Sequence, residues 1–239
     1  MMVWLLRQKQ VQKWDNPMNT VDVADFLFKE YRTSITEEEK GVTTFLLDGK
    51  EIRPSDTIAV SQPVNKLYVE KLVPSRSEVV DENVGITWGA VTGLFSESVE
   101  NIRSNSTEGL RITCKMVSEN GGDSNTLSVG DKVRMVISVD ADRDMDFVKV
   151  VCQHPACFEP LNQRSGYRWI GGSGCYLARH DSYTDLFFDT FQKGNHTLTL
   201  EFYVTREGTY QGGLSTVKCL YCPDFQAHSE SQTIKVLDK

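Results

Sequence analysis

The stretch from Asp144 to Glu230 alternates apolar and polar positions in short runs, a pattern that is typical of half-buried β-strands. Glycine, proline, asparagine or aspartate bounds each run, and these residues end strands and form turns. The runs fall in the segments DMDFVKVVCQ, FEPLNQRSGYRWIGGSGCY, DLFFDTFQKG, HTLTLEFYVTREGTY and QGGLSTVKCLYCPDF. Such a succession of short strands predicts an antiparallel β-sandwich.

The residues just before this stretch extend the same pattern towards the amino terminus. GLRITCKMV alternates, and SENGGDSNTLSVGD after it has the composition of a flexible loop. KVRMVISVDA then puts alternate apolar residues on one face of a strand, namely Val133, Met135, Ile137 and Val139. The sandwich is therefore predicted to span residues 107–239.

A smaller β domain is predicted for residues 41–100, after the acidic linker TEEEKG. In VTTFLLDGKEIRP, Asp48 and Gly49 supply the positive φ angles of a tight type I′ hairpin turn. Further strands are expected at Thr57 to Ser61 and at Lys66 to Val73. GITWGAVTGLF adds an apolar strand with glycines around Trp88, where a neighbouring backbone is expected to come close.

Residues 1–37 show helical periodicity and predict a short helical hairpin. The first helix has its apolar face at Val3, Leu6, Val11 and Trp14, and DNP, from Asp15 to Pro17, is interpreted as its stop. Thr20 is the expected cap of a second helix, whose apolar stripe is Val21, Ala24, Leu27, Phe28 and Tyr31. Two such helices bury too little to be stable alone, so this stripe must dock on another surface. The chain as a whole is predicted to be mainly β.

Composition and charge narrow the class of protein. Of the 239 residues, 39% are hydrophobic and 25% are charged, which is ordinary for a soluble globular chain. The formal net charge is −7 and the 26 Lys and Arg residues form no cluster, so nucleic acid is not expected as a partner. The apolar opening MMVWLL is too short for a signal peptide or a bilayer span, and no membrane span is expected elsewhere.

The six cysteines are Cys114, Cys152, Cys157, Cys175, Cys219 and Cys222, and they leave the redox compartment open. Their C-x4-C and C-x2-C spacings suit a tetrahedral zinc site. On a continuous strand, however, residues three apart point to opposite faces, so Cys219 and Cys222 converge only if the chain turns before Pro223. Buried thiols or one disulfide are favoured over zinc, and no cofactor is expected.

A calcium site is a second possible metal site. VDADRDMDF spaces Asp140, Asp142, Asp144 and Asp146 evenly, as at the start of a calcium loop. Met145 stands where such a loop needs glycine, and Val151 stands where it needs glutamate. A solvated strand and turn is favoured over a weak ion site.

The remaining polar motifs give no catalytic residue. In GGSGC, Ser173 lacks the glycine two residues later that a nucleophile elbow requires, so a hairpin loop is favoured. The histidines His154, His180, His196 and His228 show no paired metal-ligand spacing. No catalytic, cofactor-binding or metal-binding residue is assigned, and an enzyme is not expected.

Tyr167, Trp169 and Tyr176 flank the glycine loop. Aromatic side chains beside a turn can form a sugar platform or a protein contact. Packing into the sandwich core is favoured over a binding surface, because exposed aromatic patches are uncommon.

Taken together, RDMDFVKV, FEPLNQRSGYRW, LFFDTFQKG, LEFYVTREGTY and VKCLYCPDFQAHSE resemble the carboxy-terminal sandwich of bacterial α2-macroglobulin-family proteins. GITWGAVTGLF is similar to the strand that closes the CUB-type domain of that family. WLLRQKQVQKW and TVDVADFLF resemble the closing hairpin of its helical, thioester-type toroid. The resemblance covers nearly the whole chain and implies a carboxy-terminal fragment.

The resemblance implies a function in a large periplasmic or cell-surface trap that is cleaved by a protease and then cages it. The implied partners are the rest of the parent chain and the target proteases. None of the six cysteines is followed by Glu-Gln, so this chain has no thioester and cannot hold a protease covalently. The expected role is therefore non-catalytic, structural and recognition-related, and the alternative is a free-standing β-sandwich module that binds a glycan or a protein.

Overall fold

The structure is a computed structural model that describes residues 4–5, 16–35, 42–53, 58, 67–72, 96–106, 109–119 and 126–238. The described residues confirm a mainly β, largely antiparallel protein with a helix near the amino terminus. They fall in two compact units, one with the helix α2 and strands β1 to β3 and the other with β4 to β17. No helix in the described part of the chain is long and apolar enough to cross a bilayer. The predicted boundaries at 1–37, 41–100 and 107–239 stay predictions.

Helix α2 spans Pro17–Ile35, so it begins earlier than the predicted cap at Thr20. The cap is Asn16, whose side-chain Oδ1 accepts a hydrogen bond of 2.8 Å from the backbone N–H of Met18. Pro17 is the first helical residue, where its missing N–H costs nothing and its fixed φ suits the helix. Asn16 and Pro17 of the DNP motif therefore begin α2, whereas the predicted end of the first helix lies outside the described residues.

The apolar stripe predicted on this helix is only partly covered. Ala24 and Leu27 are half-buried, whereas Val21 and Phe28 remain 58% and 62% exposed. The first predicted helix lies outside the described residues except for Trp4 and Leu5, which are helical.

The hairpin around Asp48 and Gly49 is confirmed. Strand β1 (Val42–Leu47) pairs antiparallel with β2 (Lys50–Ile52) and with β3 (Leu67–Leu72). Both turn residues have positive φ, 46° at Asp48 and 82° at Gly49, as a two-residue hairpin of this twist requires. Apart from Ile58, which is not in a strand, the strand predicted at 57–61 lies outside the described residues. The linker at 36–41 and the strand predicted at 85–95 also lie outside them.

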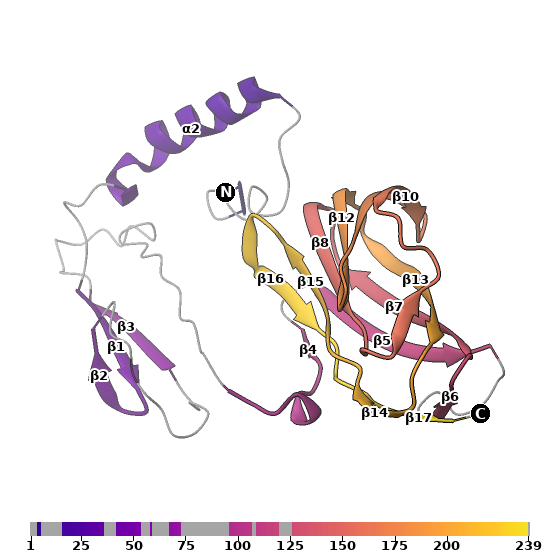
Figure 1. Cartoon of the computed structure of the whole chain (residues 1–239). Helices are drawn as coiled ribbons and strands as arrows, with labels where there is room; N and C mark the ends of the chain where they lie inside the picture. The colour runs from indigo at the N-terminus through magenta and orange to yellow at the C-terminus, as the bar shows by residue number, and fades with distance from the viewer. Residues whose placement is uncertain are drawn as a thin grey trace. The chain divides into compact units, whose positions relative to one another are not determined.

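The sandwich consists of a seven-stranded sheet in the order β10-β11-β12-β8-β15-β16-β4 and a four-stranded sheet in the order β5-β7-β13-β9 (Figure 1). The larger sheet contains β4 (Asn105–Ser106), β8 (Met145–Gln153), β10 (Gly166–Ile170), β11 (Ser173–Arg179), β12 (Tyr183–Phe191), β15 (Ser215–Cys219) and β16 (Cys222–His228). The smaller sheet contains β5 (Leu110–Ser118), β7 (Lys132–Ala141), β9 (Phe158–Pro160) and β13 (Gly194–Val204). A short 3-10 helix, η2 (Val99–Asn101), precedes β4.

The core forms between the two sheets from the alternating residues that the sequence pattern predicts. Val133, Met135, Ile137 and Val139 of β7 are each at most 1% exposed. The largest side chains in the core are Phe188 and Phe191 of β12 and Phe202 of β13, also at most 1% exposed. Burying each such ring contributes roughly 1.5 to 3 kcal/mol, so the aromatic residues of β12 and β13 stabilise the sandwich.

A third, three-stranded sheet has the order β14-β17-β6 and was not predicted. It joins β14 (Gly208–Gln211), β17 (Thr233–Leu237) and β6 (Thr126–Ser128). The pairing of β17 with β6 is parallel, unlike the other pairings in the sandwich. The sequence signal for β17 is the period-two pattern of TIKVL, in which Ile234 and Val236 are buried.

Candidate recognition surface

The β10–β11 hairpin forms one edge of the seven-stranded sheet and carries the aromatic residues singled out in the sequence. Gly171 and Gly172 make its turn with φ of 62° and 81°, and Ser173 begins β11 opposite Ile170. The expectation of a hairpin loop, rather than a nucleophile elbow, at GGSGC is confirmed.

The preference for core packing of the aromatic residues was wrong. Tyr167 and Trp169 are each 78% exposed and Tyr176 is 40% exposed, so all three lie on the outer face of the edge hairpin. The residues that alternate with them in β10, Arg168 and Ile170, are half-buried on the other face. Both faces of this strand carry large side chains, and only the position of the other layer decides which face is covered.

The exposed aromatic residues belong to a cross-strand row. Register places Tyr167 of β10 beside Tyr176 of β11, then Phe187 of β12, Lys149 of β8 and Lys218 of β15. The rings of Tyr167 and Tyr176 meet edge to face with centroids 5.2 Å apart. The Nζ atom of Lys149 lies 5.0 Å from the Phe187 ring centroid, a cation–π distance. We call Tyr167, Trp169, Tyr176 and Phe187 the aromatic surface.

A charged cluster adjoins this row. Lys149 pairs with Asp185 across 2.8 Å, and Nε2 of His180 lies 3.7 Å from the same carboxylate oxygen. The His180 ring stacks on Tyr183 with centroids 4.2 Å apart. The aromatic surface is therefore bordered by fixed charges of both signs.

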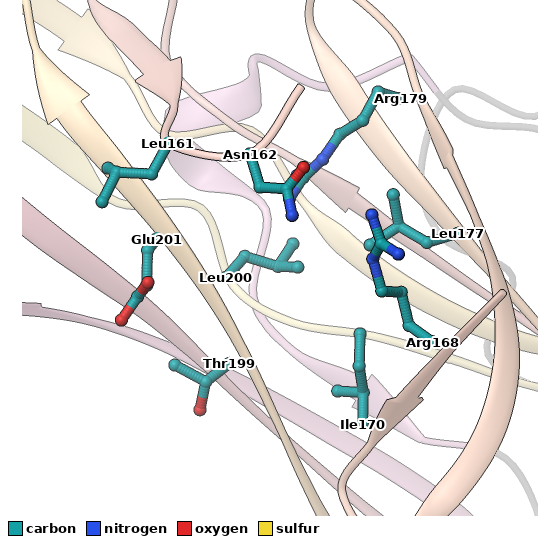
Figure 2. A pocket seen from close by; sticks show the side chains of 9 residues that line it. All are labelled: Leu161, Asn162, Arg168, Ile170, Leu177, Arg179, Thr199, Leu200 and Glu201. Atoms are coloured by element: carbon teal, nitrogen blue, oxygen red, sulfur yellow. The ribbon is translucent and has the colours of Figure 1, made fainter. Parts of the chain in front are cut away.

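On the inner side of the same hairpin lies a cavity of about 240 Å³. Figure 2 shows Arg168, Leu177 and Arg179 on one side of it and Leu161, Thr199 and Glu201 on the other. The sequence reasoning did not identify this site. The sequence signal for it is Arg168, which lies between the aromatic residues Tyr167 and Trp169 in β10.

The structure does not bring the cysteines together as a metal site. All six are free thiols, and every one except the half-buried Cys114 is buried. Cys219 and Cys222 are opposite each other because the chain does turn between them, at Leu220 and Tyr221. Within the described ranges, no three His, Cys, Asp or Glu residues form a group that suits a metal ion.

Burial also makes these thiols poor nucleophiles. It raises the pKa of Cys114, Cys157 and Cys175 to about 11, so they are protonated at neutral pH. The pKa of Cys152 is raised further by complete burial. None of these groups has the lowered pKa that a catalytic thiol needs.

The aspartates of VDADRDMDF take part in separate local contacts. Asp142 accepts two hydrogen bonds from Arg143, at 2.8 and 3.0 Å, and these lower the pKa of its carboxyl. Asp144 accepts a 2.7 Å bond from the backbone N–H of Lys193. This arrangement supports the strand-and-turn interpretation over an ion site.

The histidines lie apart, in different local environments. His154 is 5% exposed and packs on the Phe202 ring at 4.9 Å, and burial lowers its pKa. Nε2 of His196 lies 2.7 Å from the carbonyl oxygen of Gln192. Nδ1 of His228 lies 3.1 Å from the carbonyl oxygen of Ser229.

Comparison with known proteins finds a family whose model matches most of the sandwich. The family described as bacterial alpha-2-macroglobulin MG10 domain matches residues 109–224. No curated protein matches the chain.

Several solved structures resemble part of the chain. Two structures of Salmonella alpha-2-macroglobulin, one a variant and one reacted with methylamine, are 20% identical, with TM-scores of 0.47 over 55% of this chain and 9% of theirs. Escherichia coli alpha-2-macroglobulin activated by porcine elastase is 14% identical, with a TM-score of 0.46 over 84% of this chain and 19% of that one. This chain thus spans a small fraction of the proteins it resembles. Residues 109–224 are thus similar to the MG10 domain of bacterial alpha-2-macroglobulins.

Proposed function

We propose that this chain is a non-catalytic part of a bacterial alpha-2-macroglobulin-like endopeptidase inhibitor outside the cytoplasm. In this role the sandwich braces the parent molecule and recognises another protein surface during trapping. We extend the proposal to residues 41–100 as part of a CUB-like domain and to residues 1–37 as part of a helical toroid. The family of residues 109–224 supports the parent function, and the aromatic surface supports recognition.

The aromatic surface is the observation that carries the recognition role. Tyrosine and tryptophan side chains supply large contact areas at low entropic cost, and a polar atom on each ring tolerates water. Tyr167 and Trp169 are each 78% exposed, so the sandwich itself leaves most of each side chain uncovered. Contiguous exposed aromatic groups of this kind mark interaction sites.

The charges beside the aromatic surface are compatible with a protein contact. Lys149 and Asp185 are paired with each other, so a partner that excludes water there leaves neither of them without its counter-ion. The buried thiols, with raised pKa, support a role without nucleophilic chemistry.

The test uses the product of the complete reading frame that contains this sequence. It is mixed with trypsin or porcine elastase, and cleavage of casein and of a small chromogenic peptide is measured. A caging inhibitor should suppress casein cleavage while peptide cleavage continues, because only the large substrate is excluded. Unchanged casein cleavage would contradict the inhibitor function.

The recognition role is tested in the same assay with the double variant Tyr167→Ser and Trp169→Ser. We expect it to inhibit casein cleavage at least several-fold less well while its sandwich melts normally. Tyr203→Ser is the control. Tyr203 is an exposed aromatic residue as well, at 42%, but it lies on β13 of the other sheet. Equal inhibition by the wild type and the double variant would refute a role for the aromatic surface.

The same exposed rings favour a second candidate function, a glycan-binding module. Flat aromatic faces stack on the apolar faces of sugar rings, and the indole of Trp169 on this hairpin is 78% exposed. Titration of the 239-residue chain with soluble bacterial oligosaccharides should then quench Trp169 fluorescence. Saturable quenching that is lost in Trp169→Ala, together with no protease inhibition, would favour this alternative.

A further inference from the structure

The cavity under the β10–β11 hairpin contains two positive charges without an acidic partner. Its walls come from strands β10, β11 and β13 and from the segment after β9. Arg168 and Arg179 are half-buried in it, and no ion pair joins either guanidinium to a carboxylate among the residues that the structure describes.

Arg179 is held in place but not satisfied. Its Nη1 donates a 2.6 Å hydrogen bond to Oγ1 of Thr184, and its guanidinium lies 6.0 Å from the Phe202 ring centroid. Its Nε is buried with no hydrogen-bond partner in the described structure. Leaving a charged donor unpaired in a half-buried site is costly, so the surroundings compensate the positive charge of Arg179 only in part.

Arg168 is less firmly bound. Among the described residues, its Nη1 and Nη2 donate only to the backbone carbonyls of Tyr167 and Arg164, each across 3.4 Å, which is long for a hydrogen bond. Burial lowers the pKa of Arg179, and the positive charge of Arg168 lowers it further, because the two like charges repel. An anion between them would relieve the repulsion.

The rest of the cavity selects among anions. Ile170, Leu177 and Leu200 give it an apolar floor, which suits a hydrocarbon stem rather than a fully hydrated ion. Glu201 lines the opposite wall and disfavours a second negative charge on the ligand. Asn162, also in the wall, offers an amide that can donate or accept a hydrogen bond.

We propose that this cavity is a binding site for the carboxylate of an acidic peptide segment, with Arg168 and Arg179 holding the carboxylate and the apolar floor holding its aliphatic stem. Arginine forks match a carboxylate in geometry and donate charge-assisted hydrogen bonds to it. The site lies on the inner side of the hairpin, so it does not depend on the aromatic surface.

The test titrates the 239-residue chain with blocked tripeptides at low salt, by calorimetry or amide NMR. The probes are acetyl-Gly-Glu-Leu-amide, its glutamine counterpart, and acetyl-Gly-Gln-Leu with a free carboxyl end. We expect the glutamate peptide to bind at least about tenfold more tightly than the blocked glutamine peptide, as one charge-assisted contact provides. Tighter binding of the third probe than of the glutamate peptide would assign the site to chain termini rather than to acidic side chains.

Single substitutions then place the ligand in the cavity. Arg168→Gln should weaken binding of the glutamate peptide about tenfold, whereas Glu201→Gln should strengthen it several-fold by removing the facing charge. Arg206→Gln, which removes an exposed charge outside the cavity, is the matched control. Arg179→Gln would also remove the hydrogen bond to Thr184, so its effect on binding could not be separated from that loss. The test therefore relies on the Arg168 and Glu201 variants.

The proposal is overturned if the glutamate and blocked glutamine peptides bind equally, or if Arg206→Gln weakens binding as much as Arg168→Gln. It is also overturned if inorganic phosphate binds more tightly than every carboxylate probe, because the site would then select a small dianion. Each of these measurements is made without a protease. Failure of the binding-site proposal can therefore be distinguished from failure of the proposed inhibitor function.

Discussion

The Nζ atom of Lys149 lies 2.8 Å from Oδ2 of Asp185 on the neighbouring strand, and the two side chains are only 21% and 6% exposed. This pair crosses from β8 to β12 directly beside the aromatic surface. The outer face of the seven-stranded sheet is therefore not a plain solvated surface, because it combines a largely buried ion pair with exposed rings.

Removing one partner of this pair should destabilise the sandwich strongly. Lys149→Met leaves Asp185 largely buried and without its main cation, which typically costs about 3 kcal/mol of unfolding free energy. Urea unfolding of both singles and of the Lys149→Met, Asp185→Leu double variant measures this cost. We expect the double variant to lie closer to wild type than either single does, and additive losses would contradict the pairing.

His154 should make stability depend on pH. Burial lowers its pKa in the folded state below the ordinary value of 6.5, so the unfolded chain binds more protons in the window between the two values. Stability should therefore fall as pH drops below about 6.5 and level off below the lowered pKa. The carboxyl of Asp142, whose pKa is lowered from 3.8 by its hydrogen bonds to Arg143, loses its contribution to stability only as pH falls below 3.8. The effects of His154 and Asp142 on stability therefore occur in separate pH ranges.

The check is the free energy of unfolding measured at half-unit steps from pH 7.5 to 4.5. His154→Phe keeps a ring against Phe202 and should flatten the slope below pH 6.5. An unchanged slope in this variant would show that other groups govern the transition.

Gly171→Ala should destabilise the edge hairpin more than Gly172→Ala. Both glycines have positive φ, so both alanines carry a backbone penalty of about 1 kcal/mol. Only at Gly171 would the new Cβ meet another strand, 2.8 Å from the carbonyl oxygen of Thr197, because this turn packs on β13. Thermal melts of the two variants compare the effects, and equal losses would contradict that close approach.

The thiols should be protected from alkylation in the folded protein. A pKa of about 11 for Cys114, Cys157 and Cys175 reduces their thiolate fraction at pH 7.5 at least about a hundredfold relative to an unperturbed cysteine. Iodoacetamide labelling followed by mass spectrometry should find these three unmodified until denaturant is added. Rapid native labelling of any of them would refute the buried-thiol assignment.

The sequence by itself determined the local structure that depends on period and turn chemistry. Alternation in KVRMVISVDA sufficed to identify the core face of β7, since neighbouring side chains in a strand must point in opposite directions. Asp48 and Gly49 identified a hairpin because few residue pairs accept two positive φ angles. The resemblance of the strand series to bacterial α2-macroglobulins was also readable from the sequence, since it rests on the order of residues rather than on their contacts.

Tertiary structure alone decided which of two possible faces is covered and which distant residues meet. Along Tyr167, Arg168, Trp169 and Ile170, either face is bulky enough for a core, and the aromatic one is exposed because the other sheet lies on the arginine side. Arg168 and Arg179 share a cavity with Glu201 only because β13 packs under the edge hairpin. Such contacts join residues far apart in sequence, so no local period or spacing encodes them.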